Sequence, residues 1–334
     1  MQDNLFIKVT DLSRHYGPIT AVDHIDFVVQ RGEVLGFLGP NGAGKSTTMQ
    51  MLTGNLAPST GQVLINGIDL LDQPKLAKAQ IGYLPEQPPV YKELTVNEYL
   101  TYCARLHRIA RERIAQACEM AKQRCGLTEV GKRLIGNLSK GFQQRVGIAQ
   151  AIIHSPAIVI LDEPTVGLDP IQIREIRNLI RELGGEHSVI LSTHILPEVQ
   201  ATCDRVQIIN KGQLVLTDTI DHLNQASQPS SIVLALMNPP PLAELETING
   251  VERVDVFESQ RFCLHFDPQQ TASDTLAQAI AQTAVTQHWG LTELTPQRRT
   301  LEELFVQITS ADNAALSENT PADDNGMSEA AEAS

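Results

Sequence analysis

The first 220 or so residues alternate short apolar runs with segments of helical spacing. Apolar runs bounded by turn residues predict strands at 5–9, 24–29, 33–38, 61–67, 157–161 and 188–192, and a closing hairpin at 206–210 and 213–217. Apolar residues at helical spacing predict helices at 46–52, 139–153 and 171–183. Because strands and helices alternate, we expect an α/β domain with a mixed, mainly parallel sheet covered by helices.

A helical insert interrupts this alternation at about 88–137. The segment TVNE, which begins at Thr95, has the form of a capping box, and helical spacing follows it to about residue 106. A second stretch of helical spacing covers 111–125. The first domain is therefore expected to span 1–220, with the insert inside it.

The chain beyond about residue 220 has a different pattern. We expect a linker at 221–230 and then the order strand, helix, strand, strand, helix, strand, with a last helix at 300–308. That order predicts a small α+β accessory domain of ferredoxin-like form over 231–310. Residues 311–334 are acidic and rich in small residues, so we expect a disordered tail.

Composition excludes several classes of protein. The formal net charge is -13, from 39 acidic and 26 basic residues, which argues against a broad nucleic-acid surface. No apolar run approaches the roughly 18 to 20 residues of a membrane span, and the first residues do not resemble a signal peptide. The 5 cysteines include no CxxC pair, so reduced thiols in a cytosol fit better than disulfides or zinc.

The glycine-rich segment GPNGAGKST carries the clearest chemistry. It satisfies the pattern GxxxxGK(S/T) between a predicted strand and a predicted helix. Backbone N–H groups of such a loop surround phosphate oxygens, the lysine reaches the outer phosphates and the serine ligates Mg²⁺. We therefore expect a nucleotide phosphate site formed by Gly39, Pro40, Asn41, Gly42, Ala43, Gly44, Lys45, Ser46 and Thr47.

Two acidic residues follow the apolar run IVIL. A phosphate-binding loop needs a carboxylate near the magnesium ion, and Asp162 is placed to supply it at the end of a neighbouring strand. Glu163, one residue further, is then the candidate base that orients and polarises the attacking water. The alternative is that the two acids only cap the next turn.

The segment LSKGF has two interpretations from its own residues. Ser139 is either only the cap of the helix that follows or part of an anion site, because both roles use the free N–H groups at a helix start. The segment by itself leaves both open.

Taken together, the motifs resemble those of ATP-binding cassette (ABC) ATPases. The resemblance rests on GPNGAGKST, LSKGF, IVILDEP, GLDP at 167–170 and His194 after SVILST, in this order, and it covers about residues 5–217. It implies a P-loop NTPase fold, a catalytic lysine at Lys45, and ATP and Mg²⁺ as ligands. It also implies that Ser139 both caps its helix and faces the γ-phosphate of ATP held by a second copy of the chain.

The resemblance implies further site residues. Gly141 belongs to the same signature as Ser139, although Lys140 and Phe142 depart from its commonest form. Asp169 is expected to line the seam of a head-to-tail dimer, and His194 to contact the γ-phosphate and hold the water.

Two other positions carry less definite expectations. Tyr16 matches the aromatic position that stacks on adenine, with a core tyrosine as the alternative. The family's magnesium-contacting glutamine falls at Glu86 by position, while Gln87 is one residue late, so both stay candidates.

The same resemblance predicts the partners. A membrane permease is expected to dock on the helical insert, and the candidate contacts are Tyr91, Leu94, Tyr99 and Tyr102. These residues are equally candidates for the insert's own core. The leading hypothesis is a cytoplasmic ATPase subunit, peripheral on the inner face of the membrane, that drives a separate permease, with export favoured and no nucleic acid expected. The alternatives are a soluble ABC protein acting on ribosomes or DNA and an ATP-gated switch without turnover; a single cassette and Glu163 disfavour them.

Overall fold

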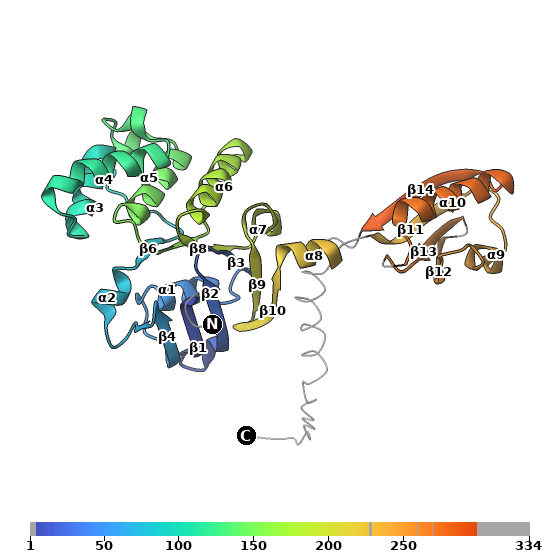
Figure 1. Cartoon of the computed structure of the whole chain (residues 1–334), viewed down its shortest axis with the longest axis horizontal. Coiled ribbons are helices and arrows are strands. Elements are labelled where there is room, and N and C mark those ends of the chain that lie inside the picture. Colours follow the sequence, from blue (N-terminus) through green and yellow to red (C-terminus); the bar gives the residue numbers. More distant parts are fainter. Residues whose placement is uncertain (1–4, 227–228, 259, 269, 299–334) are drawn as a thin grey trace, which may run out of the picture. The chain divides into compact units, whose positions relative to one another are not determined.

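The computed structural model describes residues 5–226, 229–258, 260–268 and 270–298 (Figure 1). The chain divides into two compact units, Met1–Leu223 and Asn224–Ser334. We describe each unit by itself and call them the cassette and the accessory unit. Along the part of the chain that the structure describes, no helix has both the length and the apolar character needed to cross a bilayer.

A six-stranded sheet forms the centre of the cassette, in the order β10-β9-β3-β8-β7-β6. All neighbours pair in parallel except β10, which is antiparallel to β9. Parallel strands end on the same edge, so the loops after β3, β7 and β8 meet there. This confirms the predicted mainly parallel sheet, whose strands are β3 (Val34–Leu38), β6 (Ile81–Leu84), β7 (Ile158–Asp162), β8 (Ser188–Thr193), β9 (Arg205–Asn210) and β10 (Gln213–Thr219).

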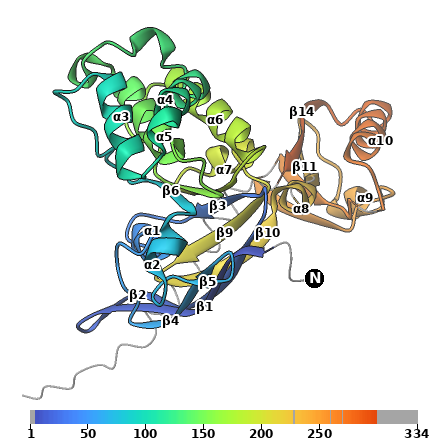
Figure 2. The ribbon, with the colours of Figure 1, turned by 60° about the vertical axis from the view of Figure 1, so that its left-hand side comes forward.

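A second, antiparallel sheet has the order β2-β1-β4-β5. Helix α1 (Lys45–Leu52) lies between the two sheets (Figure 2), and its buried Met49 and Leu52 belong to one apolar core with residues of both. The first two strands are longer than expected because register shifts near Asp11 and His24 break the apolar alternation. The strands are β1 (Leu5–Tyr16), β2 (Ile19–Gln30), β4 (Thr60–Ile65) and β5 (Ile68–Asp69).

The helical insert contains α3 (Val96–Leu106) and α4 (Arg111–Arg124), which lie beside α5 (Lys140–Ile152) (Figure 1). The predicted capping box is present: Thr95 N–H donates to the carboxylate of Glu98 at 2.8 Å, and Glu98 N–H donates to Thr95 Oγ1 at 3.3 Å. Short helical turns at Thr128–Val130 and Ile135–Asn137 lead into α5.

Three short helices have no counterpart among the expectations, and neither do the strands β5 and β6. The segment between β5 and β6 includes α2 (Pro74–Lys78), and α7 (Leu196–Thr202) follows β8 directly. Most of the expected linker at 221–230 lies in regular structure, because α8 spans Ile220–Ala226 and the next strand begins at Pro229. Helices of five to seven residues hold too few turns to show an apolar period in the sequence.

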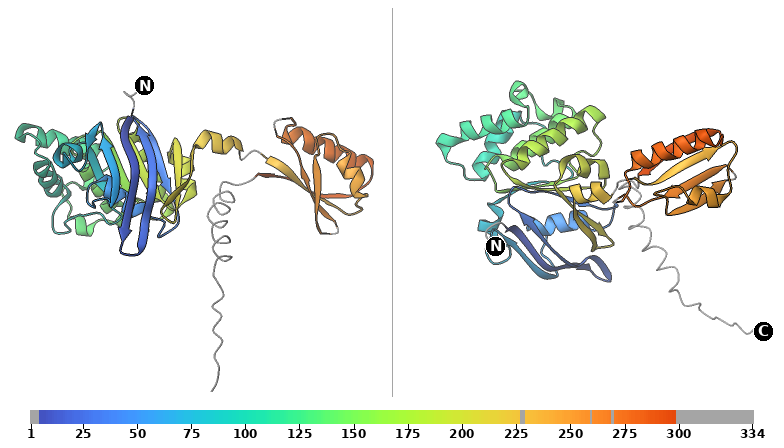
Figure 3. Two further views of the ribbon diagram at one scale, coloured as in Figure 1. Left: turned by 90° about the horizontal axis from the view of Figure 1, so that it is seen from below. Right: turned by 45° about the vertical axis from the view of Figure 1, so that its right-hand side comes forward.

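The accessory unit is a four-stranded antiparallel sheet in the order β12-β13-β11-β14 (Figure 3). Helix α10 packs on one face, where Leu234, Phe262, Ile280 and Trp289 form part of the core. The element order confirms the ferredoxin-like prediction, with β11 (Pro229–Leu236), α9 (Leu242–Glu246), β12 (Arg253–Glu258), β13 (Arg261–His265), α10 (Ser273–Thr286) and β14 (Leu291–Arg298). The helix expected at 300–308 and the tail at 311–334 lie outside the described residues.

Candidate functional site

A glycine-rich loop joins β3 to α1 at the carboxyl edge of the cassette's main sheet. Gly44 caps α1 with φ 107°, a left-handed conformation that favours glycine. A Cβ at Gly44 would lie 2.5 Å from the carbonyl oxygen of Ala21, and one at Gly39 would lie 2.4 Å from that of Ile209. Both positions therefore require glycine, and the loop keeps backbone N–H groups at the start of α1 accessible to an anion.

Lys45 folds back over this loop. Its side chain is only 6% exposed, and its ammonium group donates to the carbonyl oxygens of Gly39 at 2.8 Å and Pro40 at 3.2 Å. The same nitrogen lies 3.4 Å from Glu163 Oε1. The ammonium group is thus held against the loop that phosphate oxygens would enter.

The two acidic residues after IVIL have different surroundings. Asp162 ends β7 and accepts a 2.7 Å hydrogen bond from Ser192 Oγ on the adjacent strand β8. Burial of the Tyr83 side chain, together with the charge of Asp162, raises the pKa of Tyr83 to about 12. Glu163 has a left-handed backbone, with φ 47°, which turns its carboxylate toward the glycine-rich loop instead of into a turn cap.

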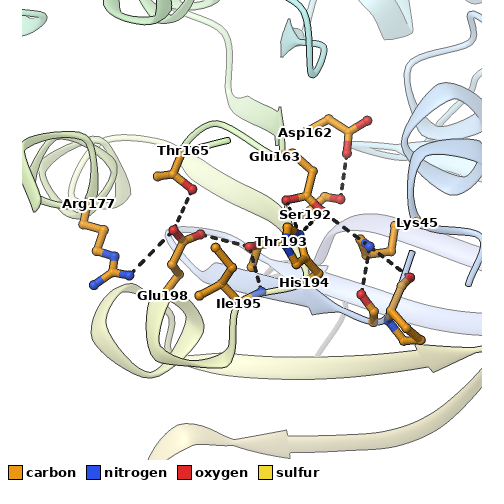
Figure 4. A network of polar contacts seen from close by, with 12 residues as sticks. Lys45, Asp162, Glu163, Thr165, Arg177, Ser192, Thr193, His194, Ile195 and Glu198 are labelled. Atoms are coloured by element: carbon orange, nitrogen blue, oxygen red, sulfur yellow. Dashed lines mark hydrogen bonds and ion pairs between the residues drawn. The ribbon is translucent and has the colours of Figure 1, made fainter. Parts of the chain in front are cut away.

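His194 completes a row of polar side chains at this edge (Figure 4). Its Nδ1 lies 2.9 Å and 3.1 Å from the two carboxylate oxygens of Glu163, so the proton of a neutral ring is on Nδ1. Glu163, 8% exposed, therefore has a cation on one side and an imidazole on the other. The arrangement holds a buried carboxylate in place as a hydrogen-bond acceptor.

These side chains face a cavity of about 390 Å³. Of the two described residues Glu86 and Gln87, Glu86 is the one that lines this cavity. The oxygen donors Ser46 and Asp162 at this edge are of the hard type that Mg²⁺ prefers. The cavity is lined by Ala21, Asn41, Gly42, Gly44, Lys45, Ser46, Thr47, Glu86, Glu163, Val166 and His194.

The predicted site residues Ser139, Gly141 and Asp169 lie at the starts of two other helices of the cassette. Ser139 caps α5, accepting from Phe142 N–H at 3.4 Å, and Asp169 caps α6 (Pro170–Gly184), accepting from two backbone N–H groups at 3.0 and 2.9 Å. A Cβ on Gly141 would meet the side chain of Gln172 at 2.5 Å. None of these three residues lines the cavity described above. Each of these helix starts is capped by a side chain of its own N-terminal residue.

The aromatic candidates divide. Tyr16 is 45% exposed, with the guanidinium of Arg14 4.7 Å from its ring centroid, so the interpretation as a core tyrosine is wrong. In the insert, Tyr99 is buried and donates to the Pro89 carbonyl, whereas the rings of Tyr91 and Tyr102 are exposed. Leu94 is half-buried, so this group is partly core and partly surface.

Sequence reasoning missed one group of residues beside the site. The buried carboxylate of Glu198 accepts from Thr165 Oγ1 at 2.6 Å and Thr193 Oγ1 at 2.9 Å, and Arg177 lies 3.6 Å away (Figure 4). The only signal was indirect: Thr165 and Thr193 each stand within two residues of a predicted site residue. Nothing in the pattern indicated that the acidic residue in PEVQ is buried.

A phosphate-binding loop after β3, a carboxylate pair after β7 and a histidine after β8, all on one edge of a parallel sheet, define a P-loop nucleoside triphosphatase. A family model described as ABC transporter matches residues 22–166. The bacitracin transport ATP-binding protein BcrA of Bacillus licheniformis is 41% identical over 66% of this chain and 72% of its own length.

Two other comparisons agree. The linearmycin resistance ATP-binding protein LnrL of Bacillus subtilis is 30% identical over 91% of this chain and 98% of its own length. The solved structure of cbiO1 from Clostridium perfringens, part of the ABC transporter complex cbiONQ, has a TM-score of 0.61 and 28% identity over 66% of this chain and 91% of its own. The chain belongs to the ABC transporter ATP-binding protein family. It is therefore an ATP-binding ATPase subunit, as the motifs predicted.

Proposed function

We propose that two copies of this chain close around Mg²⁺ and ATP and that hydrolysis drives a separate membrane permease, in the direction of export. The observation that carries the proposal is the buried carboxylate of Glu163 between Lys45 and His194, facing the cavity beside the glycine-rich loop. That geometry fits a residue that accepts a proton from a water molecule at the outermost phosphate.

In this proposal each polar side chain has one task. Lys45 and the loop N–H groups bind the outer phosphates of ATP, and His194 holds Glu163 and the attacking water in line. Ser46 and Asp162 would hold Mg²⁺, with Glu86 nearby. A bound Mg²⁺ supplies charge neutralisation on the phosphate oxygens. Tyr16, exposed at the end of β1, stacks on the adenine ring.

The second copy supplies what one cavity lacks. Ser139, Gly141 and Asp169 lie at capped helix starts outside the cavity of their own chain, so we assign them to the γ-phosphate and the seam of a partner copy. Because the γ-phosphate then links two chains, hydrolysis releases them.

Transport is the finer part of the proposal. The names of BcrA and LnrL refer to bacitracin transport and linearmycin resistance, which supports export as the direction of transport. The exposed rings of Tyr91 and Tyr102 on the helical insert are our candidate contacts for the permease, which would hold the chain at the inner face of the membrane.

The test is Glu163→Gln, which keeps the size of the side chain and removes its basicity. We expect steady ATP turnover to fall about 100- to 10,000-fold while ATP still binds and a dimer accumulates, measured by phosphate release and light scattering. Glu182→Gln, an exposed carboxylate on α6, is the matched control and keeps parental turnover.

Unchanged turnover in Glu163→Gln would remove Glu163 from this role. Affinity purification of the full chain from detergent-solubilised membranes tests the partner. We expect an integral membrane protein to co-purify, and recovery of ribosomes or DNA alone would contradict the transport assignment.

A further inference from the structure

We infer that Glu198 is a positioning residue for ATP hydrolysis, holding the two loops that carry Glu163 and His194 at a fixed separation. The inference rests on the catalytic role proposed for Glu163. Glu198 itself lies on α7 and is not among the residues that line the cavity.

The side chain of Glu198 is buried almost completely, at 1% exposure. A carboxylate in such surroundings is costly unless hydrogen bonds satisfy it, so its partners are part of the reason it is there. Those partners come from three separate segments: Thr165 from the loop after β7, Thr193 from the end of β8, and Arg177 from α6. One carboxylate thus joins segments that are far apart in sequence (Figure 4).

Both threonines stand next to residues that face the cavity. Thr165 follows Glu163 by two positions, in the loop that leads to Asp169, and its hydroxyl is 2.6 Å from Glu198 Oε1. Thr193 directly precedes His194, and its hydroxyl is 2.9 Å from Glu198 Oε2. Each carboxylate oxygen therefore holds one of the two loops, and the span of a single carboxylate sets the distance between them.

Thr193 also links this carboxylate to the backbone around it. Its hydroxyl accepts from Ile195 N–H at 3.1 Å, which fixes the turn that carries His194 into α7. Its carbonyl oxygen accepts from Gly39 N–H at 3.3 Å, at the start of the phosphate loop. A shift of Thr193 would therefore move His194 relative to both Glu163 and the loop.

The chemistry is sensitive to such a shift. Glu163 and His194 meet at 2.9 Å, and both must also reach a water molecule in line with the outermost phosphate. Lys45, by contrast, is held by the carbonyl groups of its own loop. Loss of Glu198 is therefore expected to slow the chemical step and to leave ATP binding intact.

The experiment compares Glu198→Ala and Glu198→Gln in the full chain with Glu182→Ala as the exposed control. We expect Glu198→Ala to lower kcat per folded molecule about 100-fold, because small displacements of catalytic groups have effects of that size. Its dissociation constant for ATP, measured with a fluorescent analogue, stays within about twofold, since the phosphate contacts are separate.

Glu198→Gln keeps the span and accepts or donates one hydrogen bond at each end, so we expect it to restore kcat to within about fivefold of the parent. Thr165→Val breaks one of the same links. Its effect on kcat should add little to that of Glu198→Ala in the double variant, because both remove the same connection.

The inference is overturned if Glu198→Ala keeps parental kcat per folded molecule and only its melting temperature is lowered. It is overturned equally if ATP affinity falls in step with kcat, or if Glu198→Gln is no better than Glu198→Ala. Glu163→Gln is measured beside these variants. If it retains turnover, the proposed function fails; if it abolishes turnover while Glu198→Ala keeps parental kcat, only the role of Glu198 fails.

Discussion

The cassette and the accessory unit each hold a carboxylate between a histidine and a cation, in very different surroundings. In the cassette, Glu163 contacts His194 and Lys45 and is buried at the edge of a cavity.

In the accessory unit, Asp255 contacts His265 at 2.8 Å and Arg253 at 2.7 Å, on neighbouring strands, and Arg253 is 66% exposed. Water screens the second group and not the first. The same three classes of side chain therefore form the candidate functional site in one unit and a solvated surface group in the other.

The topology of the two sheets explains this difference. Parallel strands send all their following loops to one edge, so residues after β3, β7 and β8 meet although they are far apart in sequence. Antiparallel strands bring Arg253 and His265 together on the flat of the sheet, where their side chains lean into water. The two groups therefore differ mainly in burial: Glu163 and Lys45 are buried, whereas Asp255 and Arg253 are exposed.

The largest predicted effect on ATP binding tests this contrast directly. Lys45→Ala removes a buried cation from the glycine-rich loop and should weaken ATP binding about 100- to 1,000-fold, or about 3 to 4 kcal/mol. Arg253→Ala removes an exposed cation from the matching group and should leave ATP affinity unchanged. Isothermal titration with ATP measures both variants. Normal affinity in Lys45→Ala would contradict the phosphate site.

A second contrast concerns pH. His154 stacks on His107 with ring centroids 3.8 Å apart, and burial, with the neighbouring histidine, lowers the pKa of His154 to about 4. The folded state then keeps the ring neutral while the unfolded state takes up a proton below about pH 6.5. Stability from this group is complete above pH 6.5 and is lost as the pH falls toward 4, by about 3 kcal/mol.

His154→Gln should remove most of this loss, since glutamine keeps an N–H donor for the Ile81 carbonyl and cannot be protonated. Urea unfolding followed by circular dichroism between pH 7 and pH 4 measures it in the full chain. A parental slope in the variant would show that another group titrates. Asp255 gives the contrast: its hydrogen bond from His265 lowers its pKa below 3.8, so its contribution disappears only in stronger acid.

The sequence predicted the parts of the site that are local and missed those that are not. The motif GPNGAGKST could be recognised because all its residues are adjacent in the sequence. Its Gly39 and Gly44 stand where a Cβ would collide with a carbonyl oxygen. Asp162 and Glu163 were readable from the apolar run before them.

Glu198, by contrast, is defined by partners on three other segments, and its neighbours PEVQ look like an ordinary exposed helix start. The helices α7 and α8 were missed for the same reason, since helices of seven residues are stabilised by packing more than by their own apolar periodicity.

The smallest predicted effect completes the comparison. Arg261 on β13 and Glu293 on β14 form a 3.1 Å ion pair, in which the Arg261 side chain is 47% exposed and that of Glu293 is 36% exposed. Because solvent screens such a pair, Arg261→Ala should lower stability by less than about 1 kcal/mol. Trp289, the one tryptophan of the chain, is buried in this unit, so its fluorescence in urea reports the unfolding of the accessory unit alone. The double variant with Glu293→Ala isolates the pair, and a coupling energy well above about 1 kcal/mol would contradict solvent screening of the pair.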